Sequence, residues 1–138
     1  MSRPNPLVGR PAITEPTRKG QSRHQGAAAE DEALKYLEQR GLELVARNFS
    51  SKVGELDLIM KEESGTLVFV EVRMRVSGRF GGAAASVQRP KQRRVIRAAQ
   101  AFLRKQTQWR ESPCRFDIVA IDGPAHEIEW IQGAFDAG

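Results

Sequence analysis

Residues 54–60 read Gly-Glu-Leu-Asp-Leu-Ile-Met, and residues 67–75 read Leu-Val-Phe-Val-Glu-Val-Arg-Met-Arg. Both stretches show the alternation of a β-strand, and the second is the most apolar part of the chain. Residues 61–66 contain Ser-Gly and predict a short hairpin connection. Symmetric pairing about Ser64 would place Asp57 directly opposite Glu71. This hairpin, with two facing acids, is the centre of the predicted fold.

Further elements are predicted on both sides of the hairpin. Hydrophobic periodicity, Gly41 as a helix C-cap and Pro90 at a helix start set their limits. We expect helices over 27–40 and 90–109, strands over 44–49, 116–121 and 128–131, a turn over 50–54 and a loop over 78–86. The order α-β-β-β-α-β-β predicts one α/β domain, in which helices flank a central mixed sheet.

Each predicted helix has one face toward the sheet. In the first helix the inward stripe is Ala33, Leu34 and Leu37, and Glu30 lies on the same side. The second helix buries a stripe that includes Val95, and Lys91 lies one turn before it, leaning toward the sheet. The opposite face of that helix carries three arginines: Arg93, Arg97 and Arg104.

Length and composition describe an ordinary globular protein. The chain has 138 residues, 40% hydrophobic and 28% charged, which suits one domain. Residues 1–22 hold four prolines and no hydrophobic periodicity, which predicts a mobile basic tail before a domain over 23–138. We expect no membrane span and no secretory signal, because no apolar stretch is long enough for either. The single cysteine, Cys114, excludes an internal disulfide and fits the cytoplasm.

Charge is segregated along the sequence. The net charge is +5, yet residues 72–110 contain eleven Lys and Arg and no Asp or Glu. Residues 25–71 contain five basic and ten acidic residues. Such segregation can place a positive surface beside a negative pocket, which suits a polyanion held next to a metal ion.

The facing acids of the hairpin predict a divalent-metal site. Carboxylates inside apolar strands carry a cost of several kcal/mol, and two that face each other repel unless a proton or cation lies between them. Mg²⁺ or Mn²⁺ would suit the oxygen ligands of Asp57 and Glu71, with Glu30 as a third ligand or as the holder of a bound water. The alternative is a solvated ion-pair network on a sheet face, which Asp57 and Glu71 alone would favour.

Other candidates are weaker. Residues 78–82 lack the ending that a phosphate-binding loop requires, although Arg79 and Phe80 could grip nucleic acid there. His24 and His126 have no partner of the kind that a zinc site needs. Asp117 is interpreted as structural, paired with a nearby arginine.

A set of short motifs resembles the YraN-like family of small bacterial proteins over roughly residues 26–121. The residues that carry the resemblance include Gly26, Glu30, Arg47-Asn48-Phe49, Gly54-Glu55-Leu56-Asp57, Val70-Glu71-Val72-Arg73, Lys91 and Arg115-Phe116-Asp117. The family is uncharacterised, and it is similar to the restriction-endonuclease-like fold of Holliday-junction resolvases. The resemblance implies an αβββαβ core and puts Glu30, Asp57 and Glu71 on the acidic positions of the nuclease signature.

The sequence departs from that signature at Arg73, where the nuclease pattern has lysine. Arginine stays protonated, so Arg73 could balance phosphate charge but could not act as a general base. Lys91 could supply the missing amine. The leading hypothesis is therefore a metal-dependent endonuclease acting on DNA, with branched or structured DNA as a candidate substrate. Arg75, Arg79, Arg93, Arg94 and Arg97 are the candidate DNA-binding residues.

Two other functions stay open. The first is a noncatalytic nucleic-acid-binding module on a nuclease-like scaffold, since fold likeness does not establish activity. The second is a protein adaptor, which would leave the segregation of charge unexplained. Symmetric cutting of two strands would call for a homodimer.

Overall fold

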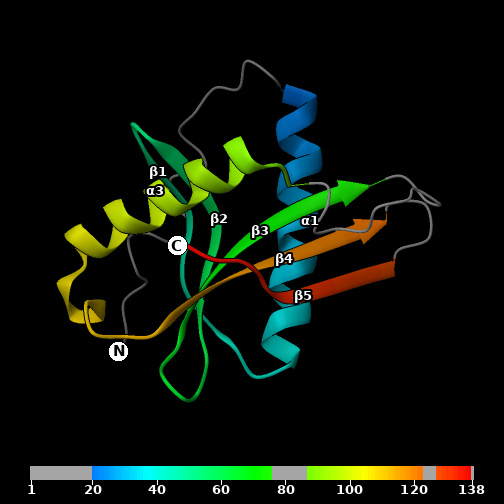
Figure 1. Cartoon of the computed structure of the whole chain (residues 1–138). Helices are drawn as coiled ribbons and strands as arrows, with labels where there is room; N and C mark the ends of the chain where they lie inside the picture. Colours follow the sequence, from blue (N-terminus) through cyan, green and yellow to red (C-terminus); the bar gives the residue numbers. More distant parts are fainter. Residues whose placement is uncertain (1–19, 76–86, 123–126, 138) are drawn as a thin grey trace, which may run out of the picture.

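The hairpin lies at the centre of a five-stranded sheet with a helix on each face. The computed structural model describes residues 20–75, 87–122 and 127–137, without the side chains of 20–25 and 75. Its elements in chain order are α1 (Gly20–Gln39), β1 (Glu43–Ser51), β2 (Gly54–Lys61), β3 (Leu67–Arg75), α3 (Arg89–Lys105), η2 (Thr107–Trp109), β4 (Cys114–Asp122) and β5 (Glu127–Phe135). This order confirms the predicted α/β fold with an αβββαβ core (Figure 1).

The sheet is mixed, as predicted. Its strand order is β1-β2-β3-β4-β5; β3 and β4 run parallel, and the other neighbours run antiparallel. The pairs from Lys61↔Leu67 to Leu58↔Val70 are symmetric about Ser64, which confirms the predicted register of the hairpin. The parallel step is possible because α3 carries the chain back across one face of the sheet.

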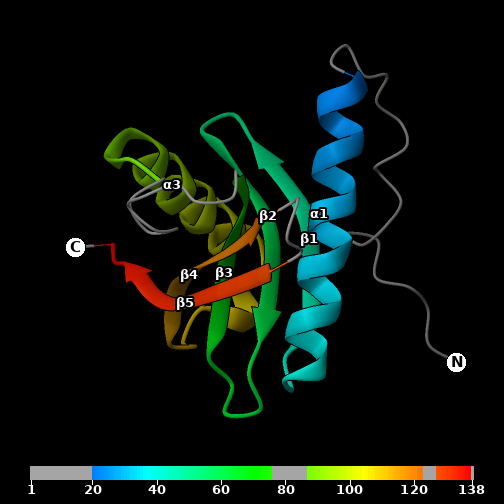
Figure 2. The ribbon, with the colours of Figure 1, turned by 90° about the vertical axis from the view of Figure 1, so that its right-hand side faces the viewer.

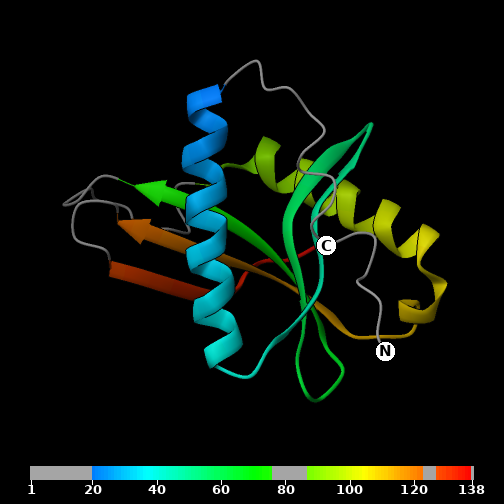
Figure 3. The same cartoon turned by 180° about the vertical axis from the view of Figure 1, so that it is seen from behind.

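The two helices cover opposite faces of the sheet, so the domain has three layers (Figure 2). The α1 face buries Ala33 and Leu37 against a cluster that includes Leu58, Val68 and Val70. Seen from behind, α1 crosses this face of the sheet (Figure 3). On the other face α3 buries its own apolar residues against a second cluster, which consists of Ala46, Phe49, Leu56, Ile59, Leu67, Phe69, Val95, Ala98, Ala99, Ala101, Phe102 and Phe116.

The end of α1 matches its prediction, whereas its start does not. Leu42 N donates to Leu37 O and Gly41 N donates to Glu38 O, with Gly41 at a φ of 95°. These bonds form a Schellman cap, in which glycine takes the left-handed position at no steric cost. The helix begins at Gly20 rather than Ala27, inside the span predicted as tail. The part of α1 that contains Ala29, Ala33 and Leu37 packs on the sheet and can nucleate the helix. Each further turn then gains hydrogen bonds, so the helix continues toward the N-terminus.

The second helix is shorter than predicted. α3 ends at Lys105, and Thr107–Trp109 form a separate 3-10 turn. The break lies at Gln106, whose φ of −112° and ψ of 78° are not helical. A half-buried Trp109 packs against the α3-side cluster after this turn, so the change of direction returns an aromatic ring to the core.

A buried acid anchors β5, which is longer than predicted. Asp117 is fully buried and accepts hydrogen bonds from Trp130 Nε1 and Gly133 N, each at 2.9 Å. Arg115 Nε lies 2.9 Å from Asp117 Oδ1 and balances its charge. The structural interpretation of Asp117 is therefore confirmed.

Several predictions lie outside the described residues. They concern the tail over residues 1–19, the loop over 78–86 with Arg79, and His126. Within the described part of the chain, no helix is both long and apolar enough to cross a membrane.

Candidate functional site

A local irregularity in β1 and β2 positions Asp57. In a regular strand, residues three apart face opposite sides, yet Ala46 and Phe49 both lie in the α3-side cluster. The change of phase falls at Asn48, whose φ of 56° is the only positive φ of a non-glycine residue in the described part of the chain. The register of β1 and β2 puts Asn48 opposite Asp57.

The partner strand changes phase at the same place. Leu56 faces α3 and Leu58 faces α1, although residues two apart would normally share a face. Asp57 lies between them and thus at the boundary of the two layers. An acid at this point can interact with groups that arrive from either face of the sheet.

Asp57 also bridges the gap where β2 and β3 separate. The paired positions of these two strands end at Leu58↔Val70. Beyond them, Val72 N donates to Asp57 Oδ2 at 2.8 Å, so a carboxylate replaces the carbonyl that a longer ladder would provide. The pKa of Asp57 is raised by burial, although the Val72 hydrogen bond and the charge of Lys91 act against this rise.

Glu71 is a buried carboxylate that faces α3. Its side chain is 5% exposed, and its Oε2 lies 3.6 Å from Lys91 Nζ and 3.9 Å from Arg73 Nη1. Burial, and then repulsion from Asp57, raise the pKa of Glu71 to about 8 against the opposing charges of Lys91 and Arg73. The inward lean predicted for Lys91 is therefore observed.

Glu30 approaches the same region from α1. Its carboxylate lies 3.6 Å from Arg47 Nε, and its side chain is 14% exposed. Burial, and then repulsion from Asp57, raise the pKa of Glu30 to about 7, and interactions with Arg47 and the side chain of Asn48 lower it. Arg47 Nη2 also lies 2.7 Å from Asp31 Oδ1, so Arg47 connects β1 to two successive acids of α1.

The three acids interact, but they do not form a closed ligand set. Asp57 is electrostatically linked to both Glu30 and Glu71. Among the described residues, however, no group of three or more His, Cys, Asp and Glu side chains is arranged to hold a metal ion. The expectation that all three carboxylates converge on one ion is thus not met in this conformation. The reason is that Glu30 is drawn to Arg47 and Glu71 to Lys91, on opposite sides of Asp57.

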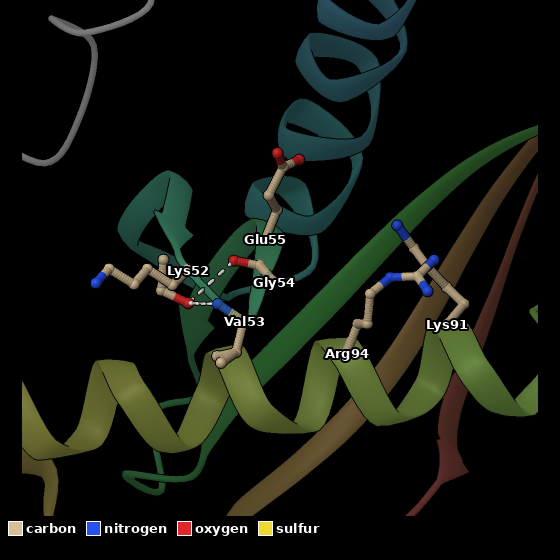
Figure 4. Close-up of a pocket in the computed structure, with 7 residues that line it drawn as sticks. Lys52, Val53, Gly54, Glu55, Lys91 and Arg94 are labelled. Carbon is tan, nitrogen blue, oxygen red and sulfur yellow. Dashed lines mark hydrogen bonds between the residues drawn. The ribbon is translucent and has the colours of Figure 1, made fainter.

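A cavity of about 370 Å³ opens beside these acids, between the β1–β2 turn and α3. It is lined by Ser51, Lys52, Val53, Gly54, Glu55, Lys91 and Arg94. In Figure 4, Lys91 and Arg94 extend from α3 on the same side, and Glu55 points away from the helix. Glu55, two residues before Asp57 in β2, acts to raise the pKa of Asp57.

The predicted basic residues fall into separate groups. Arg94 lines the cavity, whereas Arg93 and Arg97 are exposed elsewhere on α3. The side chain of Arg75 and all of Arg79 are outside the described part of the chain.

Three contributors to the site had no predicted role, although Arg47 and Asn48 belong to a motif of the family resemblance and the turn itself was predicted. They are Arg47, Asn48 and the β1–β2 turn. Asn48 carries the only available signal, because asparagine tolerates the left-handed conformation better than other non-glycine residues. Nothing in the sequence of β1 shows that this strand lies beside Glu30. The last part of α1 and the turn after it separate Glu30 from β1 in the chain.

The family is established by comparison with known proteins. A UPF0102 protein of Ralstonia nicotianae is 57% identical over 114 residues, covering 80% of this chain and 85% of that protein. A UPF0102 protein of Cupriavidus taiwanensis is 52% identical over 123 residues, covering 89% and 88%. One from Pseudomonas putida is 47% identical over 128 residues, covering 91% and 98%. The model of the uncharacterised protein family UPF0102 matches residues 29–121. The YraN-like resemblance is thus confirmed, and the chain belongs to the uncharacterised protein family UPF0102.

Proposed function

We propose that this protein is a divalent-metal-dependent DNA endonuclease. The observation that carries the proposal is the placement of Asp57 of β2 between Glu30 of α1 and Glu71 of β3. Asp57 raises the pKa of both, and Glu71 lies next to cationic side chains of β3 and α3. Acids with raised pKa values beside a cavity are typical of catalytic sites. The segregation of charge further supports a polyanionic substrate.

The donor atoms fit Mg²⁺ or Mn²⁺. Asp57 and Glu71 offer carboxylate oxygens, which these ions prefer, and a cation between them would relieve the repulsion that raises the pKa of Glu71. Glu30 would contribute through a bound water, because its carboxylate is oriented toward Arg47. When bound, the ion would polarise the phosphodiester and lower the pKa of an attacking water.

Arg73 and Lys91 have different roles in the proposed reaction. Arg73 keeps its proton and is suited to balance the charge that develops on the phosphate. Lys91 Nζ lies 3.6 Å from Glu71, next to the carboxylates, and lysine can release a proton where arginine cannot. Lys91 is therefore the residue that we assign to the position that lysine holds in the nuclease signature.

A noncatalytic nucleic-acid-binding module is the second candidate. It is favoured by Arg73 at the signature position and by the carboxylates' separate pairing with Arg47 and Lys91. In that case the acids would serve as a structural ion-pair network, and the basic surface alone would bind DNA.

Cleavage assays with linear, forked and four-way DNA, in Mn²⁺ or in EDTA, test the proposal. We expect metal-dependent cleavage that Asp57→Asn lowers by at least about a hundredfold, because metal-ion catalysis supplies several kcal/mol of transition-state stabilisation. Asparagine keeps an oxygen that can accept from Val72 N, so the fold should be retained. Asp136→Asn, at an exposed position, is the matched control.

Binding of the same DNA without cleavage at any metal concentration would overturn the endonuclease and favour the binding module. Absence of salt-sensitive DNA binding would argue against both nucleic-acid functions.

A further inference from the structure

The β1–β2 turn and α3 line the basic end of the cavity. Ser51 Oγ donates to Gly54 O and accepts from Val53 N, each at 3.2 Å, so the turn is tied to itself. A Cβ at Gly54 would lie 2.3 Å from the backbone oxygen of Arg94. Only glycine therefore allows the turn to lie directly on α3, and the cavity between them is a built feature of the fold.

The cavity has an acidic end and a basic end. Glu55, which precedes Asp57 by two residues in β2, is the acidic residue of the lining. Lys91 and Arg94 form the basic end, and Lys52 extends from the rim in the opposite direction (Figure 4). Lys91 belongs to both regions, because it lines the cavity and pairs with Glu71. A strand that presents one phosphate to the carboxylates would thus have a cationic pocket immediately beside it.

From this arrangement we propose that the basic end of the cavity, formed by Arg94, Lys91 and the Ser51–Gly54 turn, binds a backbone phosphate adjacent to the one held at the carboxylates. The inference rests on the proposed function and specifies how the nucleic acid lies in the site. The exposed guanidinium of Arg94 offers a planar set of donors suited to a phosphate. Lys52, on the rim, would add long-range attraction to the same group.

Equilibrium binding of labelled duplex DNA in EDTA, over a series of salt concentrations, tests this subsite without requiring cleavage. Loss of one phosphate contact lowers the slope of log K against log salt by about 0.9. We expect that decrease for Arg94→Gln. Arg104→Gln is the matched control, since Arg104 is exposed on the same helix but outside the cavity. Equal slopes for the two variants would overturn the subsite.

A second measurement identifies which phosphate is bound. Duplexes that carry a single neutral methylphosphonate linkage are compared at successive positions. One linkage should weaken binding to the wild type and have no further effect on Arg94→Gln, because the contact is already lost. Additive effects at every position would contradict the proposal.

The two proposals fail in different ways. If the wild type binds no DNA at any salt concentration, the proposed function itself fails and the subsite with it. If the wild type binds DNA and Arg94→Gln matches Arg104→Gln, only the subsite fails. Titration with inorganic phosphate, followed through the backbone amides of residues 51–54, separates the sources. Amide shifts without any change in the DNA slope would assign the pocket to free phosphate and overturn the nucleic-acid contact.

Discussion

Asn48 shows how the conformation of one residue can position the side chains of the candidate site. Its left-handed conformation changes the phase of β1, and its side chain acts to lower the pKa of Glu30. Across the ladder, Asp57 thereby lies at the boundary between the two helical layers. A regular β1–β2 ladder would turn Asp57 to one face, where it could interact with Glu71 or with Glu30 but not with both.

Substitution of Asn48 should reveal the energetic cost of its left-handed conformation. A residue with a Cβ loses about 1–2 kcal/mol in the left-handed region, and glycine loses nothing there. Asn48→Ala should therefore be less stable than Asn48→Gly by about 1 kcal/mol in urea unfolding. At the neighbouring exposed position the order should reverse, with Ser50→Ala more stable than Ser50→Gly, since glycine weakens an ordinary strand. Alanine more stable than glycine at both positions would contradict the role of Asn48.

At the scale of elements, the β1–β2 turn and α3 lie in contact, and α3 brings Lys91 to Glu71 and Arg94 to the neighbouring cavity. This contact depends on Gly54, which lies directly against the backbone oxygen of Arg94. The apolar cluster on the α3 face holds the helix in place, so neither the turn nor the helix can yield without loss of packing.

Gly54→Ala should destabilise the protein by about 1–3 kcal/mol, because the added methyl group overlaps backbone atoms that cannot rotate away. Gly26→Ala is the matched control. A Cβ at Gly26, within α1, would meet nothing within 4 Å, so alanine there should stabilise the helix by about 0.5–1 kcal/mol. Thermal or urea unfolding of both variants measures the difference, and equal effects of the same sign would exclude the steric explanation.

At the scale of the whole molecule, the three layers combine charges that the sequence keeps apart. α1 and the hairpin bring the acids, and α3 brings the cations to the other face of the same sheet. As a result, two carboxyl groups bind protons more tightly in the folded protein than a glutamate ordinarily does. Their pKa values rise from 4.5 to about 7 for Glu30 and to about 8 for Glu71.

The stability of the cation-free protein should therefore fall as pH rises. A carboxyl with a raised folded pKa gives its full contribution below the unfolded pKa, and this contribution is lost as pH rises through the folded value. From about pH 5 up to its folded pKa, about 7 for Glu30 and about 8 for Glu71, each group can remove up to about 1.4 kcal/mol per pH unit. Urea unfolding in EDTA over this range measures the slope. Glu71→Gln should reduce it, and a wild-type slope of zero would contradict the raised pKa values.

Local pattern was sufficient for most of the fold. The alternation of residues 54–60 and 67–75, the helix stripes and the cap at Gly41 follow from interactions between near neighbours. The hairpin register also follows, because a short connection leaves only one symmetric pairing that keeps the apolar residues buried. The proximity of Asp57 and Glu71 follows from the same register, although the paired positions end at Leu58↔Val70 and the two acids are not a ladder pair.

The sequence by itself therefore determined the order of elements, the central hairpin and the identity of the acids. Only the tertiary structure decided how Glu30 meets Arg47 and Asn48, that Glu71 pairs with Lys91, and that the β1–β2 turn closes a cavity on α3. These contacts join segments that are distant in the chain, and they depend on how closely whole elements approach one another. Residue periodicity reports which face of an element is buried, but it carries no information on which residue of another element lies opposite.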